Sequence, residues 1–129
     1  MSDSNSDPFV ALDVPRQFDL DDATLVAARD RTGNTAAYQS IATPRARAES
    51  LMRLIGGPTA GEYPGLPNGF ADQFAQTHGD AAAVAALRAE RWNNITHLFP
   101  QLLGFDKAPV QIARAKMMRA ELNAIDALK

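Results

Sequence analysis

Apolar residues recur every three to four positions along most of the chain, the spacing that places them on one face of an α-helix. The two clearest stretches carry Val84, Leu87, Trp92, Ile95, Leu98 and Phe99, and then Val110, Ala113, Met117, Leu122, Ile125 and Leu128. No segment shows the alternation of apolar and polar residues that is typical of a half-buried strand. The pattern therefore predicts an all-α fold.

Capping residues and helix breakers set the expected ends of these helices. Side chains suited to an N-cap, and prolines suited to a first turn, predict starts at Asp7–Pro8, Asp21 or Asp22, Thr43–Pro44, Asn68, Asp80 and Ala108–Pro109. Another short helix is expected over residues 35–41. The first element is expected to be short, over residues 8–12, with Pro15 as its stop. The other helix ends are predicted at Gly33–Asn34, Gly56–Gly57 and Pro100.

One stretch rich in glycine and proline divides the chain. Residues 56–69 contain five glycines and three prolines, a composition that disfavours any regular element. We therefore expect a polar disordered tail over residues 1–6, a helical region over 7–57, a linker over 58–69 and a C-terminal helical bundle over 70–129.

Composition and charge narrow the function. The 129 residues carry a net charge of −2 and no cysteine, which argues against a nucleic-acid backbone as main partner and excludes thiol chemistry. His78 and His97 lack the spacing of a helical metal pair. We expect no enzyme activity, metal or cofactor. No apolar run would span a membrane and the acidic N-terminus does not resemble a signal peptide, so a cytoplasmic protein is expected.

Two sets of side chains remain as candidate binding residues. Arg45, Arg47 and Arg53 are expected on the polar side of one helix, where they could bind an acidic partner or phosphate groups. The second set is made of methionines and aromatic residues, which are expected mostly in the core: Phe70, Phe74, Trp92, Phe99, Met117 and Met118. Because such residue types are also favoured where proteins bind proteins, a minority of them is expected at the surface. Protein binding is the preferred hypothesis. A structural homo-oligomer and a nucleic-acid-binding domain that uses the three arginines are the alternatives.

Two segments of the first half resemble a known family. Residues 7–15 (DPFVALDVP) with 18–21 (FDLD), and then residues 36–52 (AAYQSIATPRARAESLM), resemble the opening and the third-to-fourth helix region of the J-domain in HscB-type co-chaperones of iron–sulphur cluster assembly. The resemblance covers about half of the first 60 residues and implies a shortened J-domain-like helical hairpin followed by a C-terminal helical bundle.

One departure from the family limits what the resemblance implies. J-proteins carry a His-Pro-Asp motif between their second and third helices, and that motif engages a DnaK-type chaperone. Residues 28–35 stand at this place without it, so no stimulation of chaperone ATPase is expected. The resemblance instead implies binding of an iron–sulphur scaffold protein through the C-terminal bundle, with Phe70, Phe74 and Met117 as contacts.

Overall fold

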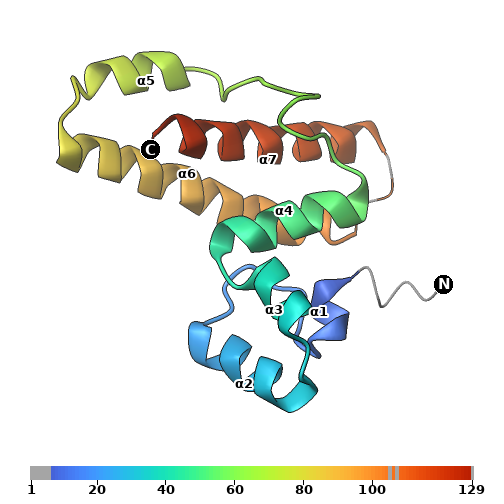
Figure 1. Ribbon diagram of the computed structural model, residues 1–129. Helices are drawn as coiled ribbons and strands as arrows, with labels where there is room; N and C mark the ends of the chain where they lie inside the picture. The colour runs from blue at the N-terminus through green and yellow to red at the C-terminus, as the bar shows by residue number, and fades with distance from the viewer. Residues whose placement is uncertain (1–6, 105, 107, 129) are drawn as a thin grey trace. The chain divides into compact units, whose positions relative to one another are not determined.

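The computed structural model describes residues 7–104, 106 and 108–128. This part of the chain forms helices and no strand, so the predicted all-α fold is confirmed (Figure 1). The helices are α1 (Pro8–Ala11), α2 (Asp22–Thr32), α3 (Thr35–Ile41), α4 (Pro44–Ile55), α5 (Phe70–Gln76), α6 (Ala81–Leu102) and α7 (Pro109–Ala127). The tail predicted to be disordered, residues 1–6, lies outside the described residues.

Short polar side chains start most of these helices, and all of the capping residues except Asn34 were predicted as caps. Asp7, Asp21, Asn34, Thr43 and Asp80 each accept a hydrogen bond from a backbone N–H in the first turn. These bonds satisfy donors that have no partner within the helix. Local sequence therefore fixes where these five helices begin.

Two predicted helix ends were wrong. Gly69, with φ of 79°, precedes α5 in place of Asn68 and provides no side-chain cap. Pro100 lies inside α6, which continues to Leu102. A proline ring fits helical φ and removes one intrahelical hydrogen bond. Here that bond falls in the last turn of the helix, where little of the helix depends on it.

The chain divides into two compact units, one that ends at Gly56 and one that begins at Gly57. In unit 1, α3 packs against α1, α2 and α4. The turn between α2 and α3 is Gly33–Asn34, and Gly33 has a φ of 68° that suits glycine. Phe9, Leu25 and Ile41, one from each of α1, α2 and α3, are fully buried.

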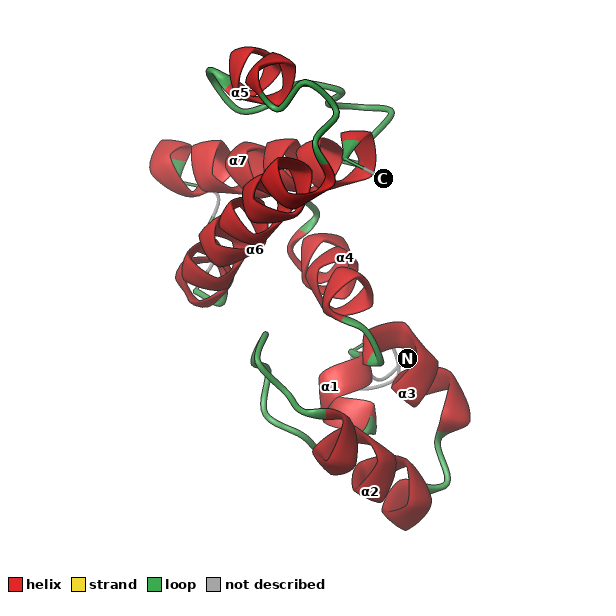
Figure 2. Cartoon of the chain, turned by 90° about the vertical axis from the view of Figure 1, so that its left-hand side faces the viewer, coloured by secondary structure: helices red, strands yellow, loops and turns green. Residues whose placement is uncertain are grey.

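Unit 2 is built on the long helices α6 and α7, which lie side by side (Figure 1). Figure 2 shows α5 as a short helix preceded by an irregular loop, which is formed by residues 57–69. Phe70 anchors α5, because its ring is buried with Leu87 of α6 and with Ala124 and Leu128 at the end of α7. One aromatic side chain thus ties the shortest helix of unit 2 to the core.

Candidate functional site

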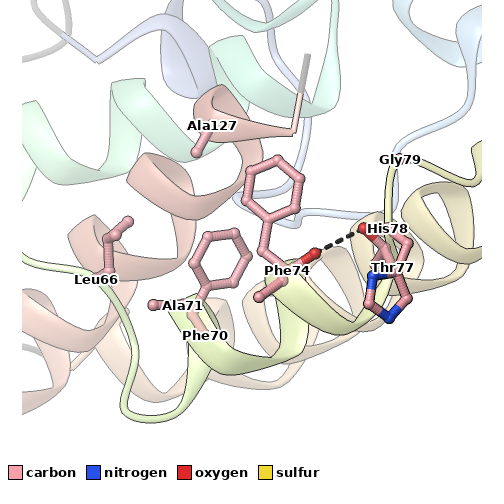
Figure 3. A pocket seen from close by; sticks show the side chains of 9 residues that line it. Leu66, Phe70, Ala71, Phe74, Thr77, His78, Gly79 and Ala127 are labelled. Carbon is pink, nitrogen blue, oxygen red and sulfur yellow. Dashed lines mark hydrogen bonds between the residues drawn. The ribbon is translucent and has the colours of Figure 1, made fainter.

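An open apolar groove lies beside α5, and we name it the Phe74 groove. It has a volume of about 510 Å³ and is lined by Leu66, Phe70, Ala71, Phe74, Ala75, Thr77, His78, Gly79 and Ala127. Figure 3 shows the rings of Phe70 and Phe74 next to one another, with Leu66 and Ala127 around them. Thr77 and His78 are its only lining side chains that can form hydrogen bonds, so the groove suits an apolar ligand surface.

The two phenylalanines of α5 pack against one another but differ in their exposure to solvent. Their ring centroids are 5.8 Å apart and the ring planes are tilted by 47°, a favourable aromatic geometry. Phe70 is 1% exposed, whereas Phe74 is 36% exposed. Thr77 closes the helix by donating from its hydroxyl to the carbonyl of Phe74. The buried ring therefore supports the ring that solvent can reach.

The glycine- and proline-rich segment 57–69 is held against α7 by side chains of that helix. The amide of Asn123 donates to the carbonyls of Tyr63 and Gly65, at 2.9 and 2.8 Å. Arg119 donates from Nε to the carbonyl of Pro58. These bonds place the segment, and with it Leu66, on the outer surface of unit 2.

A second open groove lies between this segment and α7, and we name it the Met117 groove. Its volume is about 490 Å³, and Tyr63, Leu66, Pro67, Asn68, Ala113, Lys116, Met117, Ala120 and Glu121 line it. Leu66 lines both grooves. The two grooves are therefore neighbours along one apolar surface of unit 2.

A buried ion pair connects the helices under this surface. Arg91 of α6 contacts Glu121 of α7 at 3.0 Å, and both side chains are more than nine-tenths buried. Asn94 also donates to Glu121, and Arg91 reaches Gln73 of α5 at 3.5 Å. Burial raises the pKa of Glu121, although Arg91 and Asn94 act in the opposite direction.

The structure brings two of the three predicted apolar contacts to the surface. Phe74 and Met117 are 36% and 54% exposed and line neighbouring grooves. Phe70, the third predicted contact, lines the Phe74 groove but is only 1% exposed, because its ring is part of the core. The spacing of one helical turn between Phe70 and Phe74 could not reveal which ring pointed inward.

The predicted basic patch on α4 is not present as a free surface. Arg47 was expected on the solvated side, but it is buried and donates to the carbonyls of Phe18 and Ile41. Arg45 is paired with Glu49, and Arg53 donates to the hydroxyl of Ser50. The arginines therefore serve contacts within unit 1, which weakens the nucleic-acid alternative.

Sequence reasoning missed Leu66, Asn123 and the pair formed by Arg91 and Glu121. Leu66 lies between prolines and glycines and belongs to no periodic pattern. An exposed-looking asparagine near a helix end carries no signal of a distant loop partner. Arginine and glutamate 30 positions apart could be paired only once the two helices were known to pack together.

The described residues contain neither a candidate metal-binding cluster nor a candidate membrane-spanning helix. Within them, no three His, Asp or Glu side chains gather in a way that could hold a metal ion. His97 directs Nδ1 to the carbonyl of Asn93 in its own helix. None of the helices in the described ranges is both long and apolar enough to span a bilayer.

Comparison of the chain with family models, with curated proteins and with solved structures found no match.

Proposed function

We propose that this chain is a non-catalytic adaptor that binds another protein through unit 2. The observation that carries the proposal is the surface formed by Leu66, Phe74 and Met117. These three apolar side chains are each more than one-third exposed, and they line two grooves that meet at Leu66. Clustered exposed apolar side chains are typical of binding surfaces, because solvent contact with them is unfavourable.

The surface is also well supported from beneath. Phe70 fixes α5, and Asn123 fixes the segment that carries Leu66. A groove that is already formed loses less conformational entropy on binding than one that must be ordered first. One or two exposed anchors on such a support can supply most of the binding energy.

The resemblance of the first half to HscB-type co-chaperones suggests the kind of partner. We propose an iron–sulphur scaffold protein as the ligand of unit 2, with no activation of a DnaK-type chaperone. An interface of about 800 Å² on each protein would be sufficient for a specific complex.

Titration calorimetry of the full chain with a purified scaffold protein tests this function. We expect Phe74→Ala and Met117→Ala each to raise the Kd at least about tenfold, the effect of losing a central apolar anchor. Val10→Ala is the control, because Val10 is an apolar residue of unit 1 that is as exposed as Met117. An unchanged Kd in the double variant Phe74→Ala/Met117→Ala would overturn the proposed surface.

Sedimentation of the chain alone tests the homo-oligomer. A dimer that dissociates on Phe74→Ala would assign the same surface to self-association. A monomer at all concentrations would leave the surface free for another protein.

A further inference from the structure

The outward face of α7 is covered along one half only. Toward its C-terminal end, Ala120 and Ala124 are buried, Asn123 bonds segment 57–69, and the α5 anchor Phe70 packs with Ala124. Toward its N-terminal end, Val110 and Met117 are 55% and 54% exposed. The same helix thus continues from an interface within the chain into an uncovered apolar stripe.

Helical geometry defines this stripe. Positions 110, 113 and 117 fall on one face, because successive residues are rotated by about 100°. Val110, Ala113 and Met117 are all exposed, and the last two line the Met117 groove. A stripe at these spacings is the complement of another helix that packs along α7.

Two cations border the stripe on its opposite sides. Arg114 follows Ala113, and Lys116 precedes Met117, so that helical rotation places them on either flank. Within the described part of the chain, neither forms an ion pair.

The other described cations of unit 2 have partners. Arg91 pairs with Glu121, whereas Arg88 and Arg119 donate to the carbonyls of Leu128 and Pro58. Glu121 also lines the Met117 groove, but its charge is matched by Arg91. The border of the stripe therefore carries a net positive charge that no described side chain neutralises.

We infer that the segment bound along α7 is an amphipathic helix whose apolar face is flanked by aspartate or glutamate. Its apolar side chains lie on Val110, Ala113 and Met117 and enter the Met117 groove. Its carboxylates pair with Arg114 and Lys116, which fixes its register along α7. The inference rests on the proposed function, since it specifies the chemistry of the protein segment that unit 2 binds.

The probe is a synthetic peptide of about 18 residues, because shorter helices are marginal in water. It presents leucines at helical spacing with glutamates on both flanks. A second, basic peptide serves as the comparison and has lysines in place of the glutamates. Fluorescence anisotropy with the full chain at low salt gives both Kd values. We expect the acidic peptide to bind at least about tenfold more tightly, and rising salt to reduce the difference.

Charge reversal provides the main test. Arg114→Glu/Lys116→Glu should raise the Kd of the acidic peptide at least about fivefold and lower the Kd of the basic peptide. Arg31→Glu/Arg53→Glu makes the same charge change on exposed residues of unit 1 and should leave both Kd values unchanged. If the reversed variant does not fold, the milder variant Arg114→Gln/Lys116→Gln replaces it. This variant should bind the acidic and the basic peptide with the same Kd.

Equal binding of the two peptides, or no binding of either, would overturn the inference. So would retention of the chain on phosphatidylglycerol vesicles without discrimination between the peptides, which would assign the cations to a membrane surface. If a scaffold protein binds and depends on Phe74 but not on Arg114 and Lys116, the proposed function stands and this inference fails. If the acidic peptide alone binds, the scaffold is the wrong partner and the inference stands.

Discussion

Arg47 is a structural cation of unit 1. Its guanidinium donates to the carbonyl of Phe18 at 2.6 Å and to that of Ile41 at 2.9 Å. It therefore joins α4 to the end of α3 and to the connector before α2. Burial lowers the pKa of Arg47, although Asp22 and Asp19 act against this change. The side chain remains charged at neutral pH, because an arginine cannot lose its proton in a protein.

We expect Arg47→Met to lower the free energy of unfolding by about 1–3 kcal/mol, because two main-chain carbonyls lose a charged donor. Arg45→Met should change it by less than about 0.5 kcal/mol, since Arg45 forms a surface pair with Glu49 on the same helix. Urea unfolding of the full chain, followed by circular dichroism, measures both. Equal effects of the two substitutions would show that Arg47 has no special structural role.

The contribution of Glu121 to the free energy of unfolding should fall as the pH rises, the opposite of what a carboxylate with a lowered pKa gives. Burial raises its pKa above the ordinary value of 4.5, so the folded state holds this proton more tightly than the unfolded chain. The contribution of Glu121 to the free energy of unfolding is therefore present below pH 4.5 and is lost as the pH rises through the raised pKa.

Urea unfolding from about pH 4 to about pH 7 should show wild type losing free energy of unfolding relative to Glu121→Gln. Glu62→Gln is an informative control. Thr59 donates to the carboxylate of Glu62 and lowers its pKa, so its contribution is lost as the pH falls. The same slope for both variants would contradict the role given to burial at Glu121.

At the scale of the elements, α5 is a helix that depends on its surroundings. It has seven residues and no side-chain N-cap, and an isolated helix of that length is unstable in water. His78 and Gly79 follow with φ of 49° and 75°, which reverses the chain toward α6. Packing of Phe70 against α6 and α7, and not local propensity, therefore keeps Phe74 at the groove.

The segment 57–69 owes its position to a few side chains of α7. We expect Asn123→Ala to lower the free energy of unfolding by about 1–2 kcal/mol through the loss of two hydrogen bonds. Hydrogen exchange at residues 60–68 should become faster, while exchange at the centre of α6 stays slow. Asn93→Ala, an exposed asparagine on α6, is the control and should leave the loop unchanged. Unchanged exchange in Asn123→Ala would show that the loop is held by other contacts.

At the scale of the whole molecule, the turn between α2 and α3 is the place where the J-proteins that the first half resembles carry the motif that engages a DnaK-type chaperone. That turn consists of Gly33 and Asn34, and the sequence has no His-Pro-Asp motif at any position. We expect ATP hydrolysis by a DnaK-type chaperone to stay at its basal rate in a steady-state assay with an excess of this chain. A J-protein that carries the motif is the positive control, and stimulation by this chain would contradict the prediction.

The helices of this protein could be predicted because the information for them is local. Asp7, Asp21, Thr43 and Asp80 cap helices where the sequence places them, since a cap bonds backbone donors only two or three residues away. The apolar periodicity determined the fold class in the same way. The predicted helix ends were wrong at Asn68 and Pro100, where the position of the end depends on small energetic differences.

The proposed binding surface depends on contacts between residues far apart in the chain. Only the folded chain turns Phe70 inward and Phe74 outward, buries Arg47, and brings Asn123 to the carbonyls of Tyr63 and Gly65. Periodicity gives the face of a helix but not what covers that face. The sequence by itself therefore determined which segments are helical, and the tertiary structure alone decided which apolar and charged side chains remain free to bind.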